Sequence, residues 1–382
     1  MARLGDICEK RIDTIKPTYK GNIDYIDISS VDNQRKEITQ IQSMSIVDAP
    51  SRAKQLVFPG DILVSTVRPN LNAVALVTKN TDNTLVASTG YCVLRCLPNA
   101  DNKYVFYFCQ SPAFIEKMIV QATGASYPAV TAAIVKECTI PLPPLEEQRR
   151  ITATLDKVSD LIARRRAQLD KLDLLVKSRF VEMFGDPVSN EKNWPMVTLG
   201  DIAEIRIGPF GSLLHQEDYI TGGHALVNPS HIIEGQICID EKLTVSDKKY
   251  DELSAYQLKI DDIVLGRRGE MGRCAVVHQE GLLCGTGSMI IRPNARMKPY
   301  FLQSIISNPA YKKIIEDKAV GVTMMNLNVP IVSALTVPLL PVHMQEQFID
   351  FMGRVSKSKS TIQQSLDKLE ILKKALMQQY FG

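Results

Sequence analysis

The sequence has few residues of the types that make metal sites or nucleophilic centres. Five histidines and eight scattered cysteines occur in 382 residues, and neither set shows metal-ligand spacing. We expect the cysteines to be reduced thiols in apolar segments, which indicates a cytoplasmic protein. No apolar run approaches the roughly 18 to 20 residues that span a bilayer. The first residues also lack the apolar stretch of a signal peptide.

Motifs for ATP hydrolysis and methyl transfer are missing as well. No G-x4-G-K-[ST] phosphate loop occurs, and residues 266–272 have the wrong glycine spacing for a dinucleotide loop. The nearest match to an adenine-methyltransferase Asn-Pro-Pro-Tyr is Asn308-Pro-Ala-Tyr311, which lacks the second proline. That segment is more typical of a helix start. We therefore predict no catalytic residues on this chain, and a self-contained methyltransferase or nuclease is the weakest alternative.

The most informative feature that is present is an internal repeat. Landmarks recur 197 residues later without drift: Thr89-Gly90 returns as Thr286-Gly287, Gly124 as Gly321, Pro141 as Pro338, Gln148 as Gln345, and Phe184-Gly185 as Phe381-Gly382. The chain is therefore predicted to hold two copies of one unit, each a mixed domain followed by a long helix. A hydrophobic content of 45% is sufficient for a core in both domains.

Each domain is predicted to place strands before helices. Segments rich in Val, Ile and Tyr between turn residues predict strands at 24–29, 61–67, 73–77, 91–95, 225–227, 262–265, 274–277 and 288–292. Helices are predicted at 103–110, 112–121, 299–307 and 309–317, where prolines suit the first helical position. This order implies two α+β domains, at 1–144 and 196–341, with a linker at 186–195.

Residues 145–185 and 342–382 are predicted to be long helices that form a coiled coil. Apolar residues alternate at spacings of four and three over four heptads. The seam positions are Leu155, Val158, Ile162, Leu169, Leu172, Val176, Met352, Val355, Ile362, Leu366, Leu369 and Leu376. We expect antiparallel pairing with pseudo-twofold symmetry. Leu161, Leu175 and Phe180 widen the stripe, so packing of each helix on its own domain is the alternative.

Four motifs resemble those of the specificity subunits of type I restriction–modification systems. They are Pro141-Leu-Pro-Pro-Leu-Glu-Glu-Gln148, Leu4-Gly-Asp-Ile7, Leu199-Gly-Asp-Ile202 and Ile207-Gly-Pro-Phe-Gly-Ser212. The resemblance covers essentially the whole chain, in the order target-recognition domain, helix, target-recognition domain, helix. In the second copy His343 and Met344 replace Glu146 and Glu147. The only role that we assign to these two glutamates is therefore favourable negative charge in the first turn of their helix.

The resemblance implies a non-catalytic subunit that reads double-stranded DNA. Such subunits bind a bipartite, interrupted sequence, one domain per half-site, and the coil sets the unread gap. They recruit two adenine methyltransferase subunits, which use S-adenosylmethionine, and restriction subunits, which use ATP and Mg²⁺. The two domains are only distantly alike, so the half-sites should differ. A coiled-coil adaptor with no DNA role is the alternative.

Insertions and deletions between the copies are confined to roughly residues 8–88 and 203–285, where readers of different sequences should differ. Arg can bind guanine and Asn can bind adenine through paired hydrogen bonds. The candidate DNA-binding residues after the Asp-Ile strands are Thr66, Arg68, Asn70, Asn72, Arg267, Arg268, Glu270 and Arg273. A second strip adds Ser126, Tyr127, Thr323 and Asn326. Ordinary solvated loops are the alternative for both.

Overall fold

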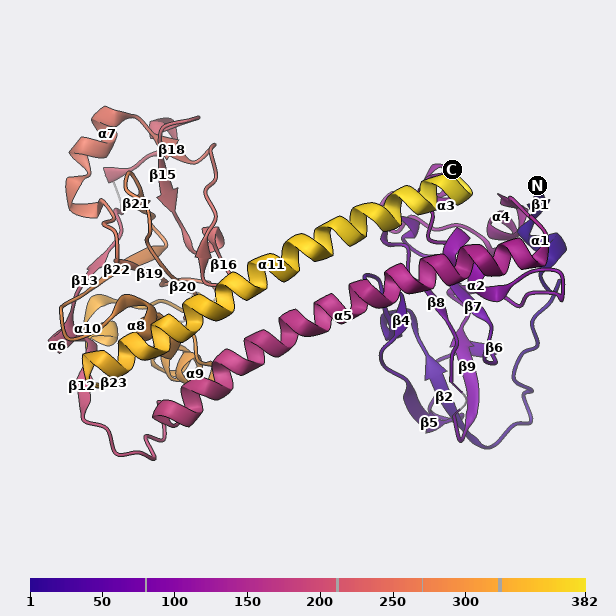
Figure 1. The fold of residues 1–382 in the computed structure, drawn as a ribbon, viewed down its shortest axis with the longest axis horizontal. Coiled ribbons are helices and arrows are strands. Elements are labelled where there is room, and N and C mark those ends of the chain that lie inside the picture. Colours follow the sequence, from indigo (N-terminus) through magenta and orange to yellow (C-terminus); the bar gives the residue numbers. More distant parts are fainter. Residues whose placement is uncertain (80, 211–212, 270, 322–324) are drawn as a thin grey trace. The chain divides into compact units, whose positions relative to one another are not determined.

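The computed structural model describes residues 1–79, 81–210, 213–269, 271–321 and 325–382. The chain divides into two compact units: unit 1 is Met1–Asp170 with Ser360–Gly382, and unit 2 is Lys171–Lys359. Each unit contains an α+β domain and parts of two 40-residue helices, α5 (Leu145–Phe184) and α11 (Val342–Phe381) (Figure 1). The predicted fold class is confirmed.

The domain of unit 1 combines a mixed sheet with an antiparallel one. In the mixed sheet the order is β5 (Gln42–Ser45), β2 (Asn22–Ile26), β9 (Thr84–Ser88) and β6 (Ala53–Leu56), with β2 parallel to β9. In the antiparallel sheet it is β10 (Tyr91–Leu94), β7 (Ile62–Ser65) and β8 (Val74–Leu76). Two short pairs join β1 (Ala2–Arg3) to β11 (Thr139–Ile140) and β3 (Val31–Asp32) to β4 (Glu37–Ile38). The helices are α1 (Leu4–Ile7), α2 (Asn102–Phe108), α3 (Pro112–Gln121) and α4 (Ala132–Glu137).

The domain of unit 2 follows a related plan. Its antiparallel sheet has the order β13 (Ala203–Ile207), β22 (Ser288–Pro293), β19 (Ile263–Gly266) and β20 (Cys274–Val276). Its mixed sheet has the order β14 (Tyr219–Ile220), β18 (Thr244–Val245), β15 (His224–Val227) and β21 (Leu283–Cys284), with β15 parallel to β21. Short pairs join β12 (Met196–Thr198) to β23 (Thr336–Pro338) and β16 (Ile232–Ile233) to β17 (Gln236–Ile237). The helices are α6 (Leu199–Ile202), α7 (Asp247–Glu252), α8 (Pro299–Ile306), α9 (Pro309–Lys318) and α10 (Val329–Ser333).

The segment that resembles a methyltransferase motif is a helix start. Asn308 is the N-cap of α9, and its side-chain oxygen accepts a hydrogen bond of 2.9 Å from the Ala310 N–H. Pro309 occupies the first helical turn, where a missing N–H costs nothing. Tyr311 is buried and donates its hydroxyl to the Thr336 carbonyl at 3.0 Å. The side chains of Asn308 and Tyr311 thus stabilise the fold, and the prediction that this segment begins a helix is confirmed.

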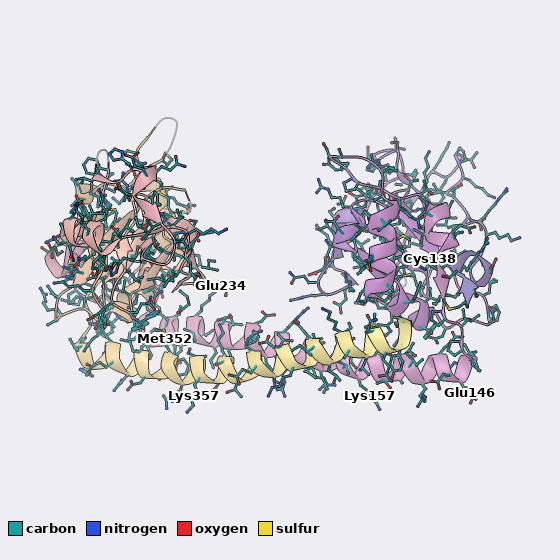
Figure 2. The ribbon with its side chains drawn as sticks, turned by 90° about the horizontal axis from the view of Figure 1, so that it is seen from above. Cys138, Glu146, Lys157, Glu234, Met352 and Lys357 are labelled. Carbon is teal, nitrogen blue, oxygen red and sulfur yellow. The ribbon has the colours of Figure 1, made fainter. Side chains whose placement is uncertain are left out.

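Within each unit α5 and α11 run antiparallel and share an apolar seam. In unit 1 Val158 and Ile162 pack with Leu366, and Arg166 pairs with Glu370 at 2.7 Å. Leu155, which is earlier on α5, shares a buried cluster with Met377 and Phe381, which are later on α11, so the two helices run in opposite directions. Figure 2 shows Glu146 in the first turn of α5 and Lys157 farther along the same helix. The predicted antiparallel pairing is therefore confirmed within the units.

In unit 2 the same two helices meet along their other halves. Val176 and Met352 pack at the edge of the core, and Lys359 pairs with Asp173 at 2.6 Å. The sequence predicts that Leu161 and Leu175 widen the apolar stripe of α5 by packing. That prediction is wrong for both residues, because their side chains are 44% and 46% exposed.

The ends of the long helices close the domain cores. In unit 2, Phe180 and Phe184 of α5 pack against Phe301 of α8 and Phe348 of α11, with ring centroids 5.1 to 5.8 Å apart. These four rings join the buried cluster that holds the domain together. Burial of side chains this large is a major source of folding free energy.

In unit 1, Met377 and Phe381 of α11 enter the core beside Tyr104 and Phe108. Phe180 and Met377 are 197 residues apart, as are Phe184 and Phe381. Each core is thus completed by the helix that follows the other domain in the chain. The sequence repeat is a domain plus its following helix, so it does not coincide with the structural unit.

A buried glutamine attaches the start of each long helix to its own domain. In unit 1 the Gln148 side chain accepts from the Asp101 N–H at 2.9 Å and donates to the carbonyls of Asn99 at 3.3 Å and Pro143 at 2.8 Å. Both carbonyls and the N–H belong to irregular backbone. Without the glutamine they would be buried polar groups lacking a partner.

In unit 2 Gln345 makes the same three bonds. It accepts from the Lys298 N–H at 2.8 Å and donates to the carbonyls of Arg296 at 3.0 Å and Leu340 at 2.8 Å. Both glutamines are fully buried. The recurring Pro-rich run with its glutamine is therefore a structural joint between domain and helix.

We expect Gln345→Leu to lower the free energy of unfolding by about 3 kcal/mol, because it leaves three backbone groups buried without partners. Gln347→Leu, on the exposed face two residues later, is the matched control and should change it by less than about 0.5 kcal/mol. Urea unfolding followed by circular dichroism measures both values. Equal losses for the two variants would contradict the role assigned to Gln345.

Candidate nucleic-acid interface

The loop that follows the Asp-Ile strand is anchored in each domain by a buried ion pair. In unit 1 Arg95 donates Nε and Nη2 to the two carboxylate oxygens of Asp61, each at 2.8 Å. The Asp61 carboxylate also accepts from the Phe58 N–H at 2.9 Å. The hydrogen bond to Asp61 raises the pKa of Arg95. Paired bonds of this kind fix geometry as well as charge.

Unit 2 repeats the anchor with the equivalent residues. Arg292 donates Nε and Nη2 to Asp262, both at 2.7 Å, and Asp262 accepts from the Lys259 N–H at 2.8 Å. The hydrogen bond to Asp262 raises the pKa of Arg292. Asp61 and Asp262, the aspartates of the Asp-Ile motif, thus fix the start of β7 and of β19, the strands that lead into the candidate loops.

The two strips predicted separately from the sequence lie side by side in unit 1. Val67 forms a backbone bridge with Ala129, Arg68 N–H donates to the Pro128 carbonyl at 2.7 Å, and Val130 N–H donates to the Thr66 carbonyl at 2.8 Å. Residues 66–72 and 123–130, which we call the paired loops of unit 1, therefore form one surface.

Unit 2 joins the equivalent segments in the same way. Arg268 bridges Asn326, and Leu327 N–H donates to the Arg267 carbonyl at 3.0 Å. We call residues 267–273 and 320–327 the paired loops of unit 2. Glu270 and Thr323, which the sequence also predicts to bind DNA, lie outside the described residues. Both units therefore present two candidate strips together.

Several candidate side chains of unit 1 are available to a partner. Arg68, Asn70, Ser126 and Tyr127 are exposed. The Arg68 guanidinium carbon lies 4.4 Å from the centroid of the Tyr127 ring. A cation and an aromatic ring of this kind are groups that proteins use on bases and phosphates. Their contact with DNA stays a prediction.

Two other candidates in unit 1 are held inside the loop. Thr66 donates its hydroxyl to the Gly90 carbonyl at 2.9 Å. Asn72 is only 7% exposed and donates its amide to the Cys109 carbonyl at 2.8 Å. In this structure both side chains support the loop, so a base contact from either would require their release.

Lys36 is a residue that sequence reasoning missed. Its Nζ donates to the Asn72 side-chain oxygen at 2.9 Å and to the Asn72 backbone carbonyl. Burial lowers the pKa of Lys36 to about 8, with Lys373 of α11 adding repulsion and Asp32 opposing it. A single lysine in a polar turn gives no pattern that sequence analysis could detect.

In unit 2 the candidates divide between surface and interior. Arg268 is exposed, and Arg273 is half-buried and donates to the Pro229 carbonyl at 3.4 Å. Arg267 is only 7% exposed, and burial followed by repulsion from Arg268 lowers its pKa. Within the described part of the chain, Arg267 Nε, Ser288 Oγ and Asn326 Oδ1 are buried atoms without a hydrogen-bond partner.

Neither a metal centre nor a membrane segment emerges from the described residues. They contain no group of three or more His, Cys, Asp or Glu side chains placed to hold a metal ion. Among the helices they form, none combines the length and apolarity that crossing a bilayer requires.

Comparison with known proteins gives one consistent result. A family model described as the type I restriction modification DNA specificity domain matches residues 1–172 and 191–371. The chain is 24% identical over 275 residues to the type I restriction enzyme MjaIX specificity subunit of Methanocaldococcus jannaschii, covering 67% of this chain and 59% of that protein. It is 26% identical over 188 residues to the HindI specificity subunit of Haemophilus influenzae, covering 48% and 40%. The matched part is thus less than two thirds of either relative's length.

Solved structures share the fold over nearly the whole chain. The crystal structure of the type I restriction-modification system S subunit from M. genitalium has a TM-score of 0.58 at 15% identity, covering 100% of this chain and 95% of that one. A chain from a study of complex assembly in the type I R-M system has a TM-score of 0.61 at 24% identity, covering 99% and 96%. Both likenesses concern the fold.

Half-buried Lys36 gives a pH-dependent prediction. The unfolded chain keeps the Lys36 proton up to about pH 10.5, whereas the folded chain releases it near pH 8, so the free energy of unfolding should rise with pH between these values. Between pH 7.5 and 9.5 the rise should be about 1 kcal/mol larger than in Lys36→Met, allowing for partial exposure. Lys54→Met, at an exposed lysine, is the control and should keep the wild-type dependence. Urea unfolding at both pH values measures the difference, and identical slopes in wild type and Lys36→Met would refute the assignment.

Proposed function

Because this chain belongs to the type I restriction modification DNA specificity family, we propose that it is the sequence-reading subunit of such a system. It binds duplex DNA at a bipartite, interrupted target, with one half-site for each unit. The observation that carries this proposal is the equivalence of the paired loops. Two strips distant in sequence are bridged in the same way in both units, yet they carry different side chains.

The differences between the paired loops support an asymmetric target. Unit 1 offers the exposed side chains of Arg68, Asn70 and Tyr127, whereas unit 2 offers the exposed side chain of Arg268. Arg and Asn recognise different base edges, and each good paired contact discriminates by about 1 to 3 kcal/mol. Two units that share a fold but carry different side chains on their paired loops would recognise two different half-sites.

Two readers in one chain also explain how short half-sites can give a tight complex. Once one unit is bound, the second contact is intramolecular and benefits from a high effective concentration. Duplex DNA also releases counterions when basic side chains approach its phosphates, so binding should weaken as salt rises. A coiled-coil adaptor without a DNA role explains neither the paired loops nor their divergence.

The catalytic work belongs to partner subunits in this proposal. We assign S-adenosylmethionine to an adenine methyltransferase partner, and ATP with Mg²⁺ to a restriction partner. The chain itself supplies recognition and docking, and acts in the cytoplasm where the chromosome lies. The cysteines fit a non-catalytic role, since burial raises the pKa of the Cys92 thiol to about 12 and that of Cys274 to about 11.

A repeated apolar pair on the long helices supports two copies of the methyltransferase partner. In unit 2, Leu174 and Leu175 of α5 are 62% and 46% exposed. In unit 1, Ile371 and Leu372 of α11 are 70% and 46% exposed. The two pairs are 197 residues apart, so the repeat places the same apolar feature on both helices. Exposed apolar residues at equivalent positions fit two identical docking partners.

Methylated-adenine mapping by long-read sequencing tests the proposed function directly. A host that carries this chain together with the methyltransferase subunit of its own system should acquire one interrupted, asymmetric methylated motif. The asymmetry is expected because the paired loops of the two units differ. A continuous palindromic motif, or no sequence preference at all, would contradict the proposal.

Native mass spectrometry tests the docking surfaces. The wild-type chain should form a complex with two methyltransferase subunits. Leu174→Glu with Leu175→Glu should leave a complex with one, because charge replaces apolar contact at one surface only. Lys242→Glu with Lys248→Glu, at exposed positions of unit 2 outside α5, is the control and should keep two. Retention of both methyltransferases by the Leu174/Leu175 variant would show that the partner docks elsewhere.

A further inference from the structure

Arg68 occupies a backbone conformation that favours glycine. Its φ is 48° and its ψ is 62°, which is the left-handed region. An L-residue is strained there because its Cβ approaches the following carbonyl. The loop enforces the conformation: Arg68 N–H donates to the Pro128 carbonyl at 2.7 Å, and Leu71 N–H donates to the Arg68 carbonyl at 2.9 Å. Strain that the surroundings enforce is typical of functional positions.

Unit 2 shows that the fold itself does not need an arginine at this place. Counting from the anchoring aspartates, Asp61 and Asp262, the equivalent of Arg68 is Gly269. Gly269 has a φ of 75°, so the same turn is made by a residue without strain. A Cβ built on Gly269 would meet nothing within 4 Å. Arg68 therefore adds backbone strain to a turn that glycine would form without strain. This indicates that the arginine side chain has a role in binding and not in folding.

Tyr127 reaches Arg68 from the other strip of the paired loops. The guanidinium carbon lies 4.4 Å from the ring centroid, and Tyr127 is 67% exposed. Gly124 permits the tight turn that carries Tyr127: its φ is 101°, and a Cβ there would lie 2.7 Å from the Tyr127 carbonyl oxygen. A stacked ring holds one face of the guanidinium without using its N–H groups.

The N–H edge of Arg68 is left for a ligand. Among the described residues, no carboxylate or carbonyl accepts a hydrogen bond or ion pair from its side chain. A planar guanidinium with two parallel N–H groups matches the O6 and N7 acceptors of guanine in the major groove. Lysine would supply charge but not this paired geometry.

We propose that Arg68 and Tyr127 form one reading element, in which Tyr127 is a positioning residue that aims the Arg68 guanidinium at a guanine of the unit 1 half-site. This inference rests on the proposed function and narrows it to one base pair and two residues. Tyr127 acts through Arg68, so its loss should affect the same base pair that loss of Arg68 affects.

The test maps methylated adenines in hosts carrying the full chain, wild type or variant, with the methyltransferase subunit of its own system. Arg68→Gly should make one guanine-containing base pair of one half-site degenerate, with at least a tenfold loss of discrimination there. The other half-site should stay unchanged. Tyr127→Leu should relax that same base pair, and Tyr127→Phe should preserve the wild-type motif because the ring remains.

Two further measurements separate reading from folding and from phosphate binding. The urea midpoint of Arg68→Gly should equal or exceed that of wild type, because glycine relieves the left-handed strain. Arg68→Lys should lose the base preference as Arg68→Gly does; an intact motif in Arg68→Lys would make Arg68 a phosphate contact and overturn the proposal.

Other outcomes overturn the pair in distinct ways. A Tyr127→Leu motif that matches wild type, or that relaxes a different base pair, would show that Tyr127 does not position Arg68. A lower urea midpoint for Arg68→Gly together with uniform loss of methylation would make Arg68 a structural residue. If the wild-type chain directs no motif at all, the proposed function fails first, and that result differs from every variant outcome.

Discussion

The structure depends on apolar contacts at the ends of the long helices. Phe180 and Phe184 arrive in the core of unit 2 from α5, which begins in unit 1, and Met377 and Phe381 make the reciprocal contribution through α11. Neither domain core is complete from its own contiguous sequence. The paired loops belong to domains whose stability therefore depends on both helices.

Polar anchors restrict where variation can occur. The two glutamines join helix to domain with the same three hydrogen bonds, and the two Asp–Arg pairs hold the strand beneath each loop. All of these groups are buried or half-buried, so changing one alone leaves a partner unsatisfied. The loops beyond the anchors carry no such penalty. A scaffold of this kind can keep its fold while its recognition surface diverges.

The sequence predicted the architecture well and the interior of the site poorly. Repetition at a fixed offset and the 4-3 spacing indicate two domains and paired helices, because both patterns can be seen in the order of residues without knowledge of tertiary contacts. Periodicity cannot say what covers an apolar stripe, so the exposure of Leu161 and the deep burial of Phe184 were beyond it. The burial of Asn72 depends on Lys36 and Cys109, which lie 36 and 37 residues away. Loop residues look alike in sequence whether they face solvent or support the turn.

In the proposed function, the contrast between Arg68 and Gly269 gives one turn two different specificities. The turn demands a positive φ in both units, and glycine meets that demand without strain. A side chain at this point projects from a backbone that hydrogen bonds already fix on either side, so binding orders no further backbone. The hydrogen bonds that hold the Arg68 backbone in its strained conformation also fix the point from which its side chain projects. Unit 1 has an arginine at this position and unit 2 has a glycine, so the two surfaces differ while the turn stays the same.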